Sequence, residues 1–182
     1  RFSGAPPAPL QTIDRNGRVI YIGTFSKVLF PSLRIGYLVA PPGLVDAYGA
    51  AVHLMARGVS TLTQAVLADF IDNGYFSTHV RRMRLVYAER QEALVNAIRG
   101  DLGGIMNVSP AQAGMNVIGW LAPGSDDTVA RRRISELGVL SFPVSYYFNE
   151  QQPRPGLLLG FCCTPAENIQ PAVQKMARAL GR

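Results

Sequence analysis

The chain opens with two short apolar runs on either side of a polar loop. Residues 18–25 (RVIYIGTF) and 34–40 (RIGYLVA) are nearly continuously apolar and rich in β-branched and aromatic side chains. Such runs are typical of strands that are covered on both faces. We therefore expect two strands inside a sheet.

Helical periodicity follows these strands. We expect one helix over residues 42–57 and a second over residues 60–74, with Ser60 as its N-cap and Gly74 as its C-cap. From residue 76 to residue 102, apolar side chains recur at helical spacing for about seven turns. A helix of this length is unusual in a globular protein, so we expect it to join two domains.

Shorter elements complete the chain. They are a strand at 115–121, a helix that begins at Ser125 or Asp126, short strands near 139–144 and 157–162, and a final helix over 165–180. This order is typical of a compact α+β unit.

Composition indicates a globular protein, because 48% of the 182 residues are hydrophobic. No apolar run approaches the roughly 20 residues of a membrane span, and no signal-peptide pattern is visible. We therefore expect a cytoplasmic protein without membrane contact. The first 18 residues read as the end of a loop, which indicates a fragment of a longer protein.

The net charge of +6 raises the question of a nucleic-acid partner. The bases cluster at 81–84 (RRMR) and 131–133 (RRR), inside helical patterns and without interleaved aromatic residues. Solvated helix faces or ion pairs explain both clusters. The charge by itself therefore does not indicate contact with DNA.

Metal chemistry is not expected. Cys162 and Cys163 are adjacent, which is not a ligand spacing, and we expect both to be reduced residues in or near the core. His53 and His79 stand on helices without companion ligands, so core packing or a helix surface accounts for them. Packing is likewise the expected role of the aromatic residues Tyr37, Trp120, Tyr146, Tyr147 and Phe148.

Lys27 is the most informative polar residue, because the chain has 16 arginines and only two lysines. It lies in the loop between the two expected strands, where an aldehyde could reach its amine. The hydroxyls of Thr24 and Ser26 and the guanidinium of Arg34 could together hold a phosphate. A phosphorylated aldehyde would suit this set, and a solvated loop lysine is the alternative.

The segment GTFSKVLFPSLRIGYLVAP resembles the cofactor-lysine segment of fold type I pyridoxal-phosphate enzymes, the aspartate aminotransferase superfamily. Its FPSLRIGY part is most similar to the aminotransferase-like domain of MocR-type regulators in the GntR group. Residues 60–94 and 156–180 resemble later helices and the closing strand and helix of the same family. The resemblance thus covers essentially the whole chain.

The resemblance implies that Lys27 binds pyridoxal 5′-phosphate covalently, that Arg34 binds its phosphate, and that Thr24 and Ser26 lie near that phosphate. It implies an α/β fold in which residues 1–84 are the remnant of a large cofactor-binding domain and residues 85–182 form a small C-terminal α+β domain. The superfamily completes its site across a two-fold axis, so a homodimer is expected.

The substrate position departs from the family pattern. Amino-acid aminotransferases grip the substrate carboxylate with an arginine in the closing strand, and Leu158 lies near that place here. Arg154 is a substitute candidate for binding substrate, although its proline neighbours fit an exposed turn equally well.

Three functions remain open. The first is the effector domain of a transcription regulator that responds to a small amine or amino acid and reaches DNA only through an upstream domain. The second is a stand-alone aminotransferase that moves an amino group between an amino acid and a 2-oxo acid. The third is a dimerisation module that has lost the cofactor. Whether the protein is an enzyme stays open, and these residues alone are expected to bind the cofactor weakly or not at all.

Overall fold

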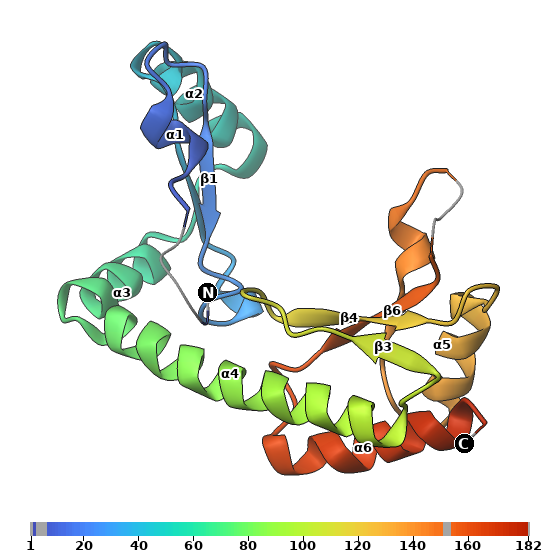
Figure 1. Cartoon of the computed structure of the whole chain (residues 1–182). Coiled ribbons are helices and arrows are strands. Elements are labelled where there is room, and N and C mark those ends of the chain that lie inside the picture. Colours follow the sequence, from blue (N-terminus) through green and yellow to red (C-terminus); the bar gives the residue numbers. More distant parts are fainter. Residues whose placement is uncertain (1, 3–6, 151–153, 182) are drawn as a thin grey trace. The chain divides into compact units, whose positions relative to one another are not determined.

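The computed structural model describes residues 2, 7–150 and 154–181 (Figure 1). The chain divides into two compact units, one of residues 5–82 and the other of residues 83–182 together with residues 1–4. Helix α4 (Tyr75–Asp101) begins in the first unit and ends in the second. Within the described residues, no helix is both long enough and apolar enough to span a bilayer.

The unit of residues 5–82 contains a hairpin and several helices. Its elements before α4 are α1 (Leu10–Ile13), β1 (Tyr21–Thr24), η1 (Pro31–Leu33), β2 (Gly36–Val39), η2 (Pro42–Leu44), α2 (Val45–Ala56) and α3 (Thr61–Asp72). Strands β1 and β2 are antiparallel, with Tyr21 opposite Val39 and Thr24 opposite Gly36. The Ser60 hydroxyl accepts a hydrogen bond from the Thr63 N–H, so the expected cap of α3 is formed.

The expectation that both strands are covered on two faces is wrong for this chain. Among the described residues, β1 and β2 pair only with each other, and Tyr37, Leu38 and Val39 are about 40% exposed. Continuous apolarity is a signal of burial, but the residues that the structure describes supply no further strand or helix layer that covers these side chains.

The first strand also begins later than the apolar pattern indicates. The Asp14 carboxylate accepts hydrogen bonds from the N–H groups of Asn16, Arg18 and Val19, at 2.6–2.9 Å. These bonds hold residues 14–19 in a turn. They also lower the pKa of Asp14, with the Asn16 N–H as the largest cause.

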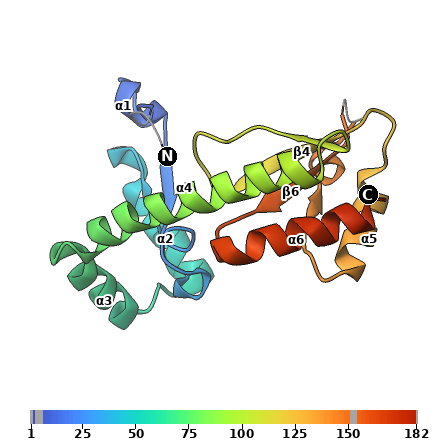
Figure 2. The same ribbon diagram turned by 60° about the horizontal axis from the view of Figure 1, so that its bottom comes forward.

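The second unit is a four-stranded antiparallel sheet with helices on one face. Its elements after α4 are β3 (Met106–Val108), β4 (Asn116–Leu121), α5 (Asp127–Glu136), β5 (Phe142–Pro143), η3 (Val144–Tyr147), β6 (Gly156–Gly160) and α6 (Ala166–Ala179). The strand order is β3-β4-β6-β5. Figure 2 shows the end of α4 beside α6 on the same side of this sheet.

Alternation along β4 and β6 separates the two faces of this sheet. Val117, Leu121, Leu157 and Leu159 are buried and belong to one cluster with residues of α4 and α6. Leu158 and its partner Ile118 are half-buried and point to the opposite face. The core of the chain therefore lies in the second unit.

A buried carboxylate fixes the connections around β6. Asp127, in the first turn of α5, accepts hydrogen bonds from the Ser145 N–H at 3.1 Å, the Ser145 hydroxyl at 2.7 Å and the Gly156 N–H at 3.2 Å. These bonds join α5, η3 and the start of β6, and so place the segment that carries Arg154.

Several residues expected in the interior are exposed. Tyr37 is 44% exposed, the cluster of Tyr146, Tyr147 and Phe148 is exposed on η3 and just after it, and Cys163 is exposed while Cys162 is buried. Trp120 is half-buried. These aromatic side chains lie in the hairpin, near the end of β4 and in or after η3, where the described residues form no second layer that covers them.

Candidate functional site

The candidate site begins with the connection between β1 and β2, residues 25–35, which we call the lysine loop. Its base is closed by a hydrogen bond from the Phe25 N–H to the Ile35 carbonyl, 3.0 Å. The Thr24 hydroxyl donates to the same carbonyl at 3.4 Å and accepts from the Ser26 N–H at 3.2 Å. Ile35 is buried at this base. The hairpin thus presents the loop as one closed unit.

Lys27 lies in a tight turn within this loop, residues 25–29, which we call the lysine turn. The Phe25 carbonyl accepts hydrogen bonds from the N–H groups of Val28 at 3.2 Å and Leu29 at 2.8 Å. The Lys27 side chain is exposed. A short helical turn therefore holds the lysine backbone and leaves its amine accessible.

Arg34 stands at the other end of the lysine loop in an unusual conformation. It follows η1 with φ 52° and ψ 30°, the left-handed region that glycine normally occupies. This conformation costs roughly 1–2 kcal/mol for a residue with a Cβ. Retaining an arginine there favours a role for its guanidinium, because glycine would relieve the strain.

A row of aromatic rings supports the base of the lysine loop. The Tyr37 ring lies against Gly23, where a Cβ would come within 2.4 Å of it. Ring centroids are 5.5 Å apart between Tyr37 and Phe25 and 5.8 Å between Phe25 and Phe76 of α4. A hydrogen bond with the Tyr21 hydroxyl raises the pKa of Tyr37.

Helix α4 also contacts the lysine turn through a polar group. The His79 Nε2 lies 3.0 Å from the Val28 carbonyl, next to Lys27 in sequence. Sequence reasoning assigned no role to His79 because nothing in the local pattern joins residues 28 and 79. The i, i+3 spacing of Phe76 and His79 places both on one helix face, which is the only sequence signal of this contact.

The hairpin thus carries Ser26, Lys27 and Arg34 on one closed loop, with Thr24 at the end of β1 beside the base of that loop. Within the described part of the chain, the Lys27 amine and the Arg34 guanidinium form no hydrogen bond or ion pair. An accessible amine and a guanidinium fit a guest that has both an aldehyde and a phosphate. The Thr24 hydroxyl is already engaged twice inside the loop, so its contribution is mainly to the shape of the loop.

Arg154 belongs to the other unit and has a different environment. Its guanidinium carbon lies 5.3 Å from the centre of the Trp120 ring, a cation–π distance. Both residues border an open hollow of about 590 Å³ along β3, which Arg99 and Asn107 also line. This position is compatible with both roles expected for Arg154, a ligand contact and an exposed turn.

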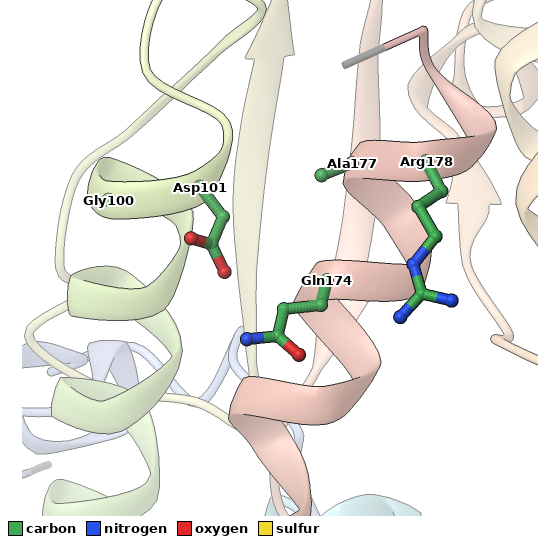
Figure 3. Close-up of a pocket in the computed structure, with 5 residues that line it drawn as sticks. All are labelled: Gly100, Asp101, Gln174, Ala177 and Arg178. Carbon is green, nitrogen blue, oxygen red and sulfur yellow. The ribbon is translucent and has the colours of Figure 1, made fainter.

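A second hollow lies near the C-terminal ends of α4 and α6. Figure 3 shows it between the ends of α4 and α6, where Asp101 points toward α6 and Gln174 and Arg178 project from that helix. The Asp101 carboxylate accepts a hydrogen bond from the Gln170 side chain at 2.7 Å. Across residues 2, 7–150 and 154–181, no cluster of three potential metal ligands occurs.

Comparison with known proteins places this geometry in context. No protein-family model matches the chain. The chain is 40% identical over 179 residues to the probable rhizopine catabolism regulatory protein MocR of Rhizobium meliloti, covering 98% of this chain and 36% of that protein. It is 27% identical over 180 residues to aromatic-amino-acid aminotransferase 1 of Thermococcus litoralis, covering 99% of this chain and 43% of that protein.

A solved structure agrees with these relatives. LysN, the α-aminoadipate aminotransferase of Thermus thermophilus complexed with N-(5'-phosphopyridoxyl)-L-leucine, matches 98% of this chain and 46% of its own with a TM-score of 0.89 and 28% identity. The chain therefore spans less than half the length of the proteins that it matches. It has the fold of the C-terminal part of a fold type I, aspartate aminotransferase-like domain, and its homologues are MocR-type regulators of the GntR group and aminotransferases.

Proposed function

We propose that this chain is part of the pyridoxal-phosphate-binding effector domain of a MocR-type transcription regulator. The observation that carries the proposal is the lysine loop, which closes at its base and carries Lys27 and Arg34 together. The 40% identity to MocR over almost the whole chain supports the regulator over the enzyme.

When bound, pyridoxal 5′-phosphate supplies an aldehyde that accepts an amine and an electron-withdrawing ring. Lys27 would hold the cofactor through its Nζ, and Arg34 would hold the phosphate by two-pronged hydrogen bonds. Ser26 would add a hydroxyl, and Thr24 would keep the loop closed. Residues 1–84 would belong to the large domain of the complete protein and residues 85–182 to its small domain.

Leu158 favours a particular class of effector. By the resemblance it lies near the place of the carboxylate-binding arginine of amino-acid aminotransferases, and its partners on the neighbouring strands β4 and β5 are the apolar Ile118 and Phe142. A carboxylate placed against these three side chains would lose hydration without gaining a cation. We therefore propose a small amine whose other end carries no carboxylate at this point; if it carries one elsewhere, Arg154 is the candidate partner.

The other properties of the whole protein follow from this proposal. DNA would be bound by a segment outside this chain, and the regulator would act in the cytoplasm. The exposed apolar side chains of α2 and α3, such as Leu54, Met55 and Leu62, would be covered in a homodimer of the complete protein.

A stand-alone aminotransferase is the second candidate. The observation in its favour is the fold agreement with LysN, whose own name describes an aminotransferase. The two functions separate in one assay: the complete protein is given an amino acid and a 2-oxo acid, and amino-group transfer is measured beside binding to DNA upstream of its own gene. DNA binding that changes with an added amine, without transfer, supports the regulator.

Trapping of the cofactor tests the role of Lys27. The complete protein is incubated with pyridoxal 5′-phosphate and reduced with borohydride, and the modified peptide is identified by mass spectrometry. We expect the adduct on Lys27, its loss in Lys27→Ala and its retention in Lys175→Ala, which removes the exposed lysine of α6. An adduct on Lys175, or none on Lys27, would contradict the proposal.

Replacement of Arg34 tests the phosphate contact. Charge-assisted hydrogen bonds contribute roughly 1.5–3 kcal/mol each, so Arg34→Ala should weaken cofactor binding by about one to two decades per lost bond. Arg34→Gly should lose the same affinity but unfold at a higher temperature than Arg34→Ala, because glycine relieves the left-handed backbone. An unchanged dissociation constant in both variants would exclude the phosphate role.

A further inference from the structure

We propose that His79 is the positioning residue of Lys27: it fixes the lysine turn on α4 so that the Lys27 amine has a defined direction. The inference rests on the proposed function, since it gives a purpose to the placement of Lys27. It rests on contacts within the unit of residues 5–82.

The first contact is a hydrogen bond between two residues that are far apart in the sequence. His79 Nε2 lies 3.0 Å from the Val28 carbonyl, and 51 positions separate the two residues. A carbonyl oxygen can only accept, so Nε2 is the donor, which both the Nε2–H tautomer and the imidazolium provide. The bond fixes the Val28–Leu29 peptide unit, the second one after Lys27.

The second contact is apolar and lies on the other side of the lysine. Phe76, one helical turn before His79, meets the Phe25 ring edge to face, with centroids 5.8 Å apart. Phe25 precedes Lys27 by two positions and Val28 follows it. The same face of α4 therefore holds the lysine turn on both sides of Lys27.

The remaining hydrogen bonds of the lysine turn are local. Among the described residues, they join positions within the range 24–35: the Val28 and Leu29 N–H groups bond to Phe25, and the Ser26 N–H bonds to Thr24. These bonds shape the turn but do not set its direction relative to the helix. The His79 bond provides that direction.

Direction matters because lysine has a long and flexible side chain, which carries about 2 kcal/mol of rotamer entropy. An error of about 1 Å in a reacting group can cost on the order of 100-fold in rate. If its local hydrogen bonds alone held the lysine turn, the turn could move relative to α4. The position of the Lys27 amine would then vary by such distances. His79 restricts this spread without touching the reacting atoms.

The test compares two substitutions of His79 whose side chains both end in an amide group and differ in length. In the complete protein, His79→Gln keeps an N–H donor near the position of Nε2, whereas the shorter side chain of His79→Asn cannot reach the Val28 carbonyl. The matched control is His53→Asn on the exposed surface of α2, which replaces the other histidine of the chain.

The first readout is hydrogen exchange without cofactor. We expect the Val28 and Leu29 amides to exchange at least about fivefold faster in His79→Asn, the change that matches a lost hydrogen bond of about 1 kcal/mol. Exchange in β4 and β6 should stay unchanged, and His79→Gln and His53→Asn should match the parent protein. Equal exchange in all four proteins would overturn the proposal.

The second readout is the rate at which added pyridoxal 5′-phosphate develops its imine absorbance. We expect His79→Asn to slow this rate on the order of 10- to 100-fold and His79→Gln to restore it. If the parent protein forms no imine, the proposed function fails, whereas the exchange readout still decides the role of His79. Normal exchange with slow imine formation in both variants would also overturn the positioning role, because it would show direct participation of the ring.

Discussion

At the scale of single residues, the adjacent Cys162 and Cys163 are expected to differ in the reactivity of their thiols. Burial raises the pKa of the Cys162 thiol to about 11, and its Sγ lies 3.7 Å from the Met115 carbonyl. Cys163 is exposed. Since the thiolate is the reactive form, we expect a thiol reagent at pH 8 to modify Cys163 within minutes and Cys162 only after denaturation.

Peptide mass spectrometry of the Cys163→Ser variant measures this protection, and the same peptide after denaturation serves as the control. Rapid labelling of Cys162 in the folded variant would contradict it.

The raised pKa of Cys162 also makes the stability of the fold depend on pH. The stabilisation that it represents is fully present below the ordinary pKa of 9.0 and is lost as pH rises toward about 11, so alkaline unfolding should begin in this window.

The sequence offers candidate residues only where their chemistry shows in a local pattern. The pattern from Thr24 to Arg34 pointed to Lys27 because a lysine is rare here and stands between two apolar runs. His79 could not be identified from the sequence, because its contact with Val28 forms only when α4 packs against the hairpin. Tyr37 and Cys163 were misassigned because residue type predicts average burial and not the number of layers that the chain provides.

At the scale of elements, two glycines allow a matched test. A Cβ at Gly119 of β4 would lie 2.2 Å from the Met106 Sδ inside the core, whereas a Cβ at Gly23 of β1 would meet the ring of exposed Tyr37. The Tyr37 ring can swing into solvent, but Met106 is enclosed. We expect Gly119→Ala to destabilise the second unit by about 1–3 kcal/mol and Gly23→Ala by less.

Urea unfolding followed by circular dichroism measures both free energies. Equal losses for the two variants would show that the core around Met106 can rearrange, contrary to the expectation.

Element prediction succeeded where capping chemistry was explicit. Asp126 begins α5 as expected: its carboxylate accepts from the N–H groups of Thr128 at 2.8 Å and Val129 at 3.1 Å. The Thr128 hydroxyl is the largest cause that lowers the pKa of Asp126. Strand β3 was missed because three residues are too short to show a period, and the strand expected at 139–144 pairs only at Phe142 and Pro143.

At the scale of the whole molecule, the two units differ in their cores. Among the described residues, the buried hydrophobic side chains lie in the second unit except for Ile35 and Leu67. We therefore expect residues 83–182, expressed alone, to unfold cooperatively in urea, and residues 5–82 alone to lack a cooperative transition. Circular dichroism and amide proton spectra of both segments measure this difference.

The Phe2 contacts offer a control for that experiment. The Phe2 N–H donates to the Gln112 carbonyl at 2.9 Å, and the Phe2 ring lies 6.1 Å from that of Phe161. A segment of residues 83–182 lacks this ring and should be slightly less stable, while keeping its transition. A cooperative transition in residues 5–82 would show that a hairpin and helices with two buried apolar side chains suffice.

The two ends of helix α4 lie in different environments. Its buried residues, from Gln91 to Ile98, lie toward its C-terminal end, while Phe76 and His79 near its start hold the lysine turn. Helix formation is cooperative, so the packing of the C-terminal end and the contacts of Phe76 and His79 stabilise one and the same helix. A ligand that stiffens the lysine turn would stabilise the helical turns around Phe76 and His79, and by linkage stabilising those turns would strengthen the binding of that ligand.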